Sequence, residues 1–586
     1  MYLVALTREP LAASDDRFGN RPVQQRQSGS RFLTVVTDHQ FSRFAEHGDQ
    51  YRVSDTIVPI TTSPAGLLRS EVTLTKDLEK VHVSMSPVGG ATVYHVADTQ
   101  GNFYCSTRIS LLRDAGVPIV ENRAVLPELF CYTYVTPPNT MYENVKRLLL
   151  GSRVSFEIKD GRFEVASQTI YLPTSTESRG TAASLEEATV ATLEAMTEEV
   201  RKLRPLEGQV AVPMSGGIDS SILWALCNRE LGIRSSNSTG YPFENPERDT
   251  EKEYALSAAK ALGAEHDFFE MTTGDYLRAI VEGIAISEDP IHMQAALFQR
   301  QYATGLPSET RVLVSGQGAD GINGFRLQAK LFAARRNLST RWVTANPVLG
   351  RRIARTLRAA KVRAKRLDIA VGEHLPLGDP DNTIWTHEKY GNEEWVQRYF
   401  GTTREQTIQG RYDLVSQFGD HDIYDRLAML YLYSDIAVAG AIWAKIAEAH
   451  GRGMFYPFTA FSVMDAPLSI PWDVKLAELK KVLRGVARLL DVPEFILTRP
   501  KSGLGISPDR WGVPGGPLEP LIALTRGHFD IDVIRQLQKN PKRRNAMSFW
   551  CILNYSIWKR LFIDNESVDT LLDEIVVASD RPADRR

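Results

Sequence analysis

The stretch that decides the fold reads Val210-Ala-Val-Pro-Met-Ser-Gly-Gly-Ile-Asp-Ser-Ser221. Its first residues have the apolar pattern of a buried strand. The pattern breaks at Ser215-Gly-Gly and resumes with helical spacing at Ile222, Leu223 and Leu226. A strand, a tight glycine turn and a helix are therefore predicted.

The glycine turn has chemistry suited to phosphate. Adjacent glycines let backbone N–H groups point into one concavity at a helix N-terminus, and serine hydroxyls can add donors. Asp219 would repel phosphate unless a cation lay between them, which suggests Mg²⁺. A turn with a capping serine is the simpler alternative, but it does not require Asp219. The hydroxyls come from Ser215, Ser220 and Ser221.

Residues 215–220, Ser-Gly-Gly-Ile-Asp-Ser, resemble the pyrophosphate loop of ATP pyrophosphatases that adenylate carboxylates or carbonyls. In that family the loop grips the β- and γ-phosphates, which leave together while AMP goes to the substrate. The resemblance implies ATP and Mg²⁺ as cofactors and Asp219 as a metal ligand. It places around the nucleotide Val212, Ser215, Gly216, Gly217, Asp219 and Ser220.

Composition limits the classes of function. The 586 residues carry a formal charge of −2, so no global field argues for nucleic acid or a membrane surface. No signal-peptide pattern begins the chain, and no run near eighteen apolar residues is recognised. The cysteines form no C-x-x-C pair and are expected to be reduced core thiols of a cytoplasmic protein. They are Cys105, Cys131, Cys227 and Cys551.

Residues 1–180 predict a mostly antiparallel β domain, because short alternating runs are separated by Gly-Gly, Asp-Gly and Pro-Pro. The stretch Thr140–Gly151 and the hairpin-like run Ile158–Phe163 resemble the end of the glutaminase domain of glutamine-dependent asparagine synthetases. That glutaminase uses a cysteine at the mature N-terminus as its nucleophile. Position 2 is Tyr2 and the first cysteine is Cys105, so the fold is expected without glutamine hydrolysis.

The second domain is predicted over residues 181–586, after a Thr/Ser-rich linker at 173–180. A helix is expected from Ala183 to Arg204, with Ser184 as its cap and Glu187 completing a capping box. It leads directly into the phosphate loop.

A second loop repeats the strand and glycine turn, in Val312-Leu-Val-Ser-Gly-Gln-Gly-Ala-Asp320. It resembles the Ser-Gly-x-Gly-Ala-Asp loop of the synthetases, which implies that Asp320 shares the metal with Asp219 and that Ser315, Gly316, Gln317 and Gly318 contact the nucleotide. A turn with a capping aspartate is the alternative. Asparagine-forming enzymes carry glutamate at position 317 and β-lactam synthetases a tyrosine. Glutamine cannot act as a base at neutral pH, so the amine must lose its proton elsewhere.

Further candidates match the family one residue at a time. Ser238 lies where the next strand of a doubly wound sheet should end, near the family's adenine contacts. Glu251 fits the family's helix start, although a solvated helix N-turn favours acids equally. Lys480 matches a lysine in the family's nucleotide-binding pattern. Lys501 matches the catalytic lysine that neutralises charge on the α-phosphate and the tetrahedral intermediate, the alternative being a surface lysine.

Two segments depart from the asparagine-forming pattern. Where the synthetases read Arg-Val-Pro-Phe-Leu-Asp, this chain has Phe455 and Thr459 in place of the polar residues, which implies an acceptor other than free aspartate. The run Arg326–Arg366 is rich in Lys and Arg and has no acid. It could bind an acidic peptide or protein partner, but a solvated helical insertion is the more frequent explanation. Phe332 and Trp342 are expected to pack, so no nucleic-acid partner is predicted.

The predicted fold is α/β: a glutaminase-like β-rich domain without its nucleophile, then a doubly wound ATP-pyrophosphatase domain. The predicted function is an ATP-dependent, AMP- and pyrophosphate-forming amide ligase. The family's cysteine-less branch includes lasso-peptide macrolactam synthetases and β-lactam synthetases. Gln317 and the basic run favour intramolecular macrolactam formation on a peptide in natural-product biosynthesis. A β-lactam-type or two-substrate amide synthetase is the alternative, and a catalytically silent partner-binding scaffold is the alternative from another class.

Because Tyr2 replaces the nucleophile, we predict that glutamine is not hydrolysed. Glutamate release from glutamine should stay at the level of a no-enzyme blank, measured on protein free of contaminating amidases. Release clearly above that blank would contradict the prediction.

Overall fold

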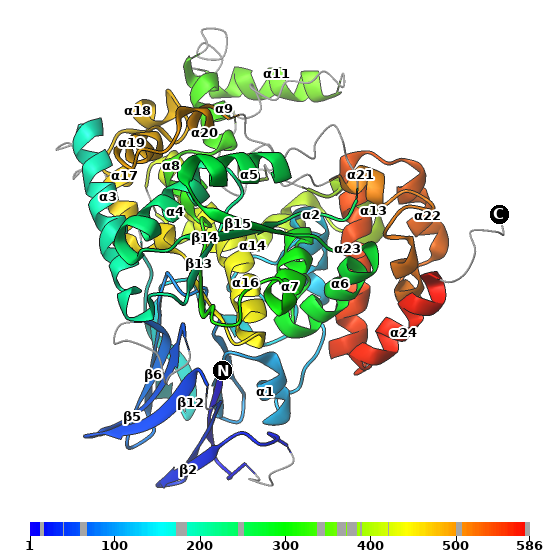
Figure 1. Cartoon of the computed structure of the whole chain (residues 1–586). Coiled ribbons are helices and arrows are strands. Elements are labelled where there is room, and N and C mark those ends of the chain that lie inside the picture. Colours follow the sequence, from blue (N-terminus) through cyan, green and yellow to red (C-terminus); the bar gives the residue numbers. More distant parts are fainter. Residues whose placement is uncertain are drawn as a thin grey trace.

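Antiparallel and parallel strands occupy different parts of the chain in the computed structural model (Figure 1). Strands before residue 170 form antiparallel sheets, and later strands form a parallel sheet covered by helices. The predicted fold class is confirmed. The domain boundary and linker predicted near residue 180 lie outside the described residues. The structure describes residues 1–11, 17–38, 40–58, 67–171, 184–243, 251–336, 346–359, 371, 384–386, 390–419, 421–499 and 507–579.

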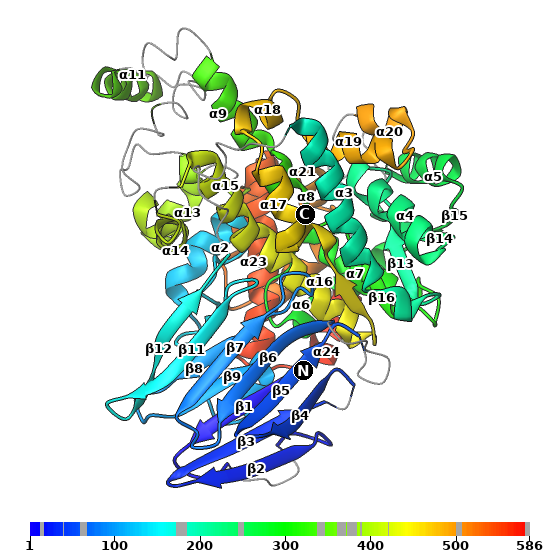
Figure 2. The same ribbon diagram turned by 90° about the vertical axis from the view of Figure 1, so that its left-hand side faces the viewer.

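The antiparallel strands lie together at one end of the molecule, below the helices (Figure 2). One sheet, in spatial order, contains β10 (Lys146–Arg147), β8 (Tyr94–Ala97), β9 (Phe103–Ser106), β1 (Tyr2–Thr7), β3 (Arg31–Thr37) and β2 (Val23–Ser28). The other contains β12 (Arg162–Thr169), β11 (Arg153–Lys159), β7 (Lys80–Met85), β6 (Leu68–Thr75), β5 (Gln50–Thr56) and β4 (Ser42–His47). The expected hairpin is confirmed, because Ile158 pairs with Phe163.

β1 is buried on both faces. Val4 and Leu6 pack in the core between the two antiparallel sheets, whereas Leu3 and Ala5 face the core shared with the helices. Tyr2 also packs in the core between the sheets, and its hydroxyl lies 3.2 Å from Ser70 Oγ. Cys105 is fully buried in the same core, and burial raises the pKa of its thiol. Neither side chain is placed or charged to act as a nucleophile.

The parallel sheet has the strand order of a doubly wound fold. Its spatial order is β15 (Glu265–Phe269), β14 (Ser235–Thr239), β13 (Val210–Pro213), β16 (Val312–Val314) and β17 (Gly453–Phe455). Val210 and Val212 pack on one face, and Ala211 belongs to the core on the other. The order reverses between β13 and β16, and open α/β sheets bind ligands at that switch point.

α3 begins where its sequence signal predicts. α3 starts at a capping box made by Ser184 and Glu187, which confirms the predicted helix and cap. The helices up to residue 336 are α1 (Ile109–Asp114), α2 (Leu126–Tyr132), α3 (Leu185–Arg201), α4 (Ile218–Leu231), α5 (Glu251–Leu262), α6 (Thr273–Ser287), α7 (Met293–Thr304), α8 (Ala319–Asn323) and α9 (Arg326–Arg336). The later ones are α11 (Pro347–Ala359), α13 (Glu393–Phe400), α14 (Arg404–Ser416), α15 (Ile423–Tyr431), α16 (Ala437–Ala449), α17 (Phe461–Leu468), α18 (Trp472–Leu476), α19 (Lys481–Leu489), α20 (Glu494–Thr498), α21 (Pro508–Trp511), α22 (Ile531–Lys539), α23 (Arg543–Phe562) and α24 (Val568–Ser579).

α15 and α16 form one long helical run through a π-helical turn, η5 (Leu432–Ile436). The run Ile423–Ala449 is long and apolar enough to cross a membrane by length and composition. The search of the sequence for apolar runs near eighteen residues did not single it out. Its most apolar window is 78% buried inside the protein, as the core helix of a folded domain would be. Helical segments of π type often occur at functional sites.

Buried ion pairs join the N-terminal sheets to this run. Arg69 bridges Asp55 and Glu448, the latter at the end of α16, and Arg108 also reaches Glu448. Burial opposes ionisation of Glu448, but the positive charges around it, the guanidinium group of Arg69 first and that of Arg108 among them, together outweigh burial and hold the pKa of that carboxyl well below its usual range. Removing one partner of such a buried pair is costly, so the sheets and helices act as one structure here.

Glu128 provides a pH-dependent test of the shared core. This α2 residue is buried, accepts a 2.5 Å hydrogen bond from Thr136, and has its pKa raised by burial to about 7. The folded state therefore binds this proton more tightly than the unfolded chain, and stability falls as pH rises from about 4.5 to about 7.

We expect Glu128→Gln, which mimics the protonated side chain, to be more stable than wild type by about 1–3 kcal/mol at pH 8 and no different at pH 4. Denaturant unfolding at both pH values measures this difference. The exposed Glu143→Gln serves as a control that should show no pH-dependent difference. Equal stabilities of Glu128→Gln and wild type at pH 8 would contradict the expectation.

Candidate functional site

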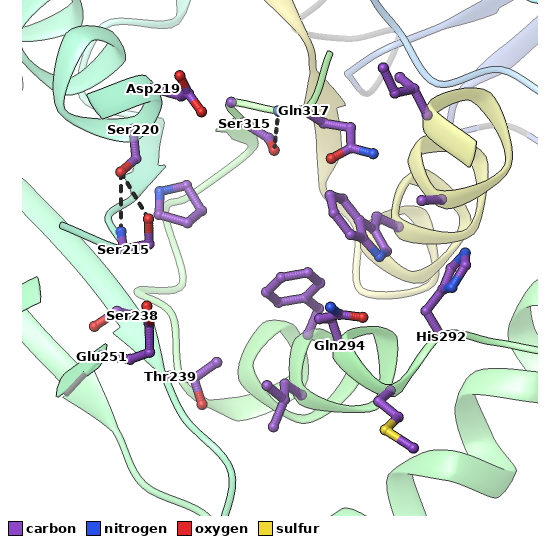
Figure 3. A pocket seen from close by; sticks show the side chains of 18 of the residues that line it. Ser215, Asp219, Ser220, Ser238, Thr239, Glu251, His292, Gln294, Ser315 and Gln317 are labelled. Carbon is purple, nitrogen blue, oxygen red and sulfur yellow. Dashed lines mark hydrogen bonds between the residues drawn. The ribbon is translucent and has the colours of Figure 1, made fainter. Parts of the chain in front are cut away.

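The two glycine loops meet because β13 and β16 are adjacent parallel strands. Val210 pairs with Val312 and Ala211 with Leu313, so both strands end at the same edge of the sheet. The loop 215–217 then leads into α4 and the loop 315–318 into α8. The predicted strand, turn and helix are confirmed in both places, and Figure 3 shows Asp219, Ser220 and Gln317 around the junction.

Close approaches explain the glycines. Gly216 has φ +69°, and a β-carbon there would collide with the carbonyl oxygen of Tyr254. Gly318 has φ +99°, and its β-carbon would lie 2.7 Å from Thr459 Cγ2. A β-carbon on Gly316 would lie 3.1 Å from Asp219 Cβ, so the second loop packs directly against the first.

Hydroxyl groups stiffen both loops. Ser220 Oγ accepts from Ser215 N at 3.2 Å and lies 3.2 Å from Ser215 Oγ, and Ser315 Oγ accepts from Gln317 N at 3.3 Å (Figure 3). Ser221 does not serve as a donor at the loop: its side chain is fully buried and is absent from the described cavity wall. The described wall also lacks Val212, Gly216 and Gly217, which shape the loop from behind.

Lys480 joins the two carboxylates predicted to hold a metal. Its ammonium lies 2.5 Å from Asp219 Oδ2 and 2.8 Å from Asp320 Oδ1. Burial lowers the pKa of Lys480, but the two carboxylates outweigh burial and raise it above the usual lysine value. Lys480 adopts φ +59°, a left-handed conformation that costs a non-glycine residue energy and so marks a constrained position. The ammonium offsets the repulsion between two facing carboxylates.

The donor set fits Mg²⁺. This ion prefers oxygen ligands and is commonly held by one or two carboxylates together with substrate phosphates. Asp219 and Asp320 supply such carboxylates from separate loops. Within the described ranges, no cluster of three or more His, Cys, Asp or Glu side chains could hold a metal. The nucleotide phosphates and water would complete the oxygen ligands of such an ion.

Arg499 ties α5 to the first loop. It donates to the carbonyl oxygen of Ser215 at 2.9 Å and to Glu251 Oε1 at 2.8 Å, and its guanidinium lies 3.8 Å from the ring centroid of Tyr254. Glu251 lines the cavity, so it is not simply a solvated acid in the first turn of α5. The expected catalytic Lys501 follows two residues after Arg499 and lies outside the described residues.

A cavity of about 480 Å³ extends from the loops across the sheet edge. Ser238 lines it at the end of β14, as predicted, and its hydroxyl lies 2.8 Å from His266 Nε2. In Figure 3, His292 and Gln294 lie at the end of the cavity away from Ser215. The wall there is largely aromatic and apolar, with Leu297, Phe298, Trp443, Met547 and Trp550.

Several residues of the cavity wall were not predicted from the sequence. Thr133, from the β-rich part of the chain, and Arg543, from α23, reach the same cavity as the glycine loops, and so do His292 and Asp435. No motif marks them; the π-helical turn that carries Asp435 has no sequence signature. Phe455 and Thr459 were expected to alter the acceptor pocket. Both are buried and absent from the described wall, so they do not contact the cavity directly.

The basic run is only partly described. α9 and α11 belong to it, and α11 projects at the top of the molecule (Figure 1). Residues 337–345 and 360–366 of the run, with Trp342, lie outside the described residues.

Comparison with known proteins relates the chain to one family. The family described as asparagine synthase matches residues 192–560, a range that contains both loops and Lys480. The chain is 22% identical over 507 residues to asparagine synthetase (glutamine-hydrolyzing) 1 of Bacillus subtilis, which covers 82% of this chain and 75% of that protein. It is 23% identical over 483 residues to a putative asparagine synthetase (glutamine-hydrolyzing) of Mycobacterium tuberculosis, with coverages of 77% and 69%.

We predict that Lys480→Met destabilises the fold by about 3–5 kcal/mol without Mg²⁺, because the variant leaves two carboxylates facing each other without their buried cation. Added Mg²⁺ should raise the melting temperature of this variant more than that of wild type. Thermal unfolding with and without MgCl₂ measures both effects. Lys481→Met, which removes the neighbouring lysine, should behave as wild type, and equal Mg²⁺ responses in all three proteins would contradict the prediction.

Proposed function

This chain belongs to the asparagine synthase family, and from that premise we propose that it closes a peptide into a macrolactam by joining the peptide's own amine and carboxylate. The protein is an ATP-dependent, amide-forming ligase that produces AMP and pyrophosphate, as enzymes of this family do. The peptide substrate and the intramolecular reaction are our proposal. We also place the enzyme in the cytoplasm, since its four cysteines are buried thiols of the core.

Adenylation solves a chemical problem. A carboxylate at neutral pH is a poor electrophile, so its oxygen first attacks the α-phosphorus of ATP and pyrophosphate leaves. The amine nitrogen then attacks the acyl carbon, AMP departs, and the nitrogen loses a proton. Mg²⁺ held by Asp219 and Asp320 would neutralise charge on the pyrophosphate. The Ser215–Gly217 loop offers backbone N–H groups at the N-terminus of α4, which suit the phosphate oxygens.

The observation that carries the peptide proposal is the aromatic wall of the cavity. Phe298, Trp443 and Trp550 line the part beyond the glycine loops, so this part offers apolar contacts that free aspartate, with its charged groups, cannot use. A wall of this kind suits a larger substrate with apolar side chains. Tyr2 and the buried Cys105 support an amine that comes from the substrate rather than from glutamine.

The test uses peptides with a free N-terminal amine and one internal Asp or Glu, together with N-acetylated copies. Both forms should support carboxylate-dependent exchange of labelled pyrophosphate into ATP, because adenylation needs only the carboxylate. Only the free-amine form should lose one water in mass. Free aspartate with ammonia should give neither exchange nor asparagine.

Three results would contradict or redirect the proposal. Exchange only with small carboxylates would favour a β-lactam-type enzyme, and exchange with amide formation only after addition of a second amine would favour a two-substrate synthetase. The absence of exchange with every carboxylate would favour a partner-binding scaffold.

A further inference from the structure

The attacking amine must give up a proton, and the residue at the family's usual position cannot accept it. Gln317 lines the cavity, and an amide has no basic site at neutral pH. Three candidate bases on the described wall are committed elsewhere, because Asp219 and Asp320 pair with Lys480 and Glu251 pairs with Arg499. Among the described acidic and histidine side chains of the wall, His292 and Asp435 remain.

His292 is placed at the N-terminus of α7 but does not cap it. Its Nδ1 atom lies 3.5 Å from Thr133 Oγ1, and the centroid of its ring lies 6.3 Å from that of Tyr134. Its Nε2 atom is shielded from solvent and has no hydrogen-bond partner among the described residues. A buried nitrogen of this kind calls for a ligand or water. Burial lowers the pKa of His292, and Asp435 opposes that shift, so the imidazole is neutral at pH 7 and can accept a proton.

Asp435 faces the same cavity from the π-helical turn η5. Burial raises the pKa of this carboxyl, and the charges of His292 and Arg411 oppose the shift. Its neighbour Ser434 is held by Tyr134, whose hydroxyl accepts a 2.7 Å hydrogen bond from Arg411. These hydrogen bonds hold the π-helical turn in place. Asp435 on this turn and His292 line the same cavity.

We propose that His292 is the catalytic base for the attacking amine and that Asp435 is a positioning residue for that amine and for the imidazolium, an assignment that rests on the proposed amide-forming function. The Nε2 atom of His292 is shielded in the unliganded protein, so the ring must turn to face the amine when the peptide binds. As the nitrogen then forms its bond to the acyl carbon, the N–H proton passes to His292 Nε2 and the bond from the acyl carbon to AMP breaks. Asp435 balances the positive charge on the ring. The imidazolium returns the proton to solvent as the product leaves.

The test separates adenylation from amide formation in His292→Gln, which keeps a polar side chain of similar reach. Pyrophosphate exchange with the N-acetylated peptide should stay within about threefold of wild type, since no amine takes part. Hydroxylamine is uncharged at pH 7 and can pass its proton to water in place of a protein base, so hydroxamate formation from the same peptide should also persist. Lactam formation from the free-amine peptide should fall by a factor on the order of 10² or more, the scale of general base catalysis.

The outcomes are distinct. Wild-type rates of lactam formation in His292→Gln would overturn the assignment of the base, and so would equal losses of exchange and lactam formation in a folded variant. No exchange in wild-type protein would instead overturn the proposed function. His528→Gln is the matched control, because that histidine contacts Asp564 near α22 and lies outside the described cavity wall.

Asp435→Asn tests the positioning role. It should lower kcat for lactam formation while leaving the KM for ATP and the rate of exchange close to wild type. A merely structural role would lower exchange and lactam formation together and would reduce the melting temperature. That result would remove Asp435 from the assignment.

Discussion

The parallel pairing of β13 with β16 is the constraint on which the site depends. It brings two strand ends to one edge at the point where the strand order of the sheet reverses. The Ser-Gly turns that follow place Asp219 and Asp320 so close that one ammonium, from Lys480, contacts both. Each loop contributes a single carboxylate, so without this pairing the predicted metal site would lack one of its two protein ligands.

Buried charge has to be balanced at every level of this structure. Lys480 neutralises the loop carboxylates, Arg499 holds both the first loop and Glu251, and Arg69 satisfies Glu448 at the end of α16. Each pair carries a desolvation cost that only a partner at close range offsets. These ion pairs join residues that lie far apart in the sequence, and they fix the positions of the charged groups around the cavity.

The antiparallel sheets have a structural role in this chain. Tyr2 fills the core between the sheets, and the segment that connects β9 to β10 supplies α2 and Thr133. Thr133 reaches the cavity beside His292, so a part of the chain that resembles a separate glutaminase shapes the synthetase site. The aromatic wall continues from α7 and α16 to α23, which makes the cavity a product of the whole chain.

The sequence by itself determined the features that depend on local backbone chemistry. The two units of strand and glycine turn, the capping box of α3 and the hairpin at Ile158–Phe163 were all predicted from short stretches. Positive φ angles and close backbone contacts permit only glycine at such turns, so the signal is strong and local.

Only the tertiary structure decided which distant side chains meet. Lys480 and Asp219 are 261 positions apart, and Arg499 and Ser215 are 284 apart, so no periodicity or spacing relates them. The same holds for His292 on α7, Asp435 on a π-helical turn and Thr133 after α2. The physical reason is that packing of the sheet and helices sets these contacts, and packing depends on side-chain direction and burial across the whole chain.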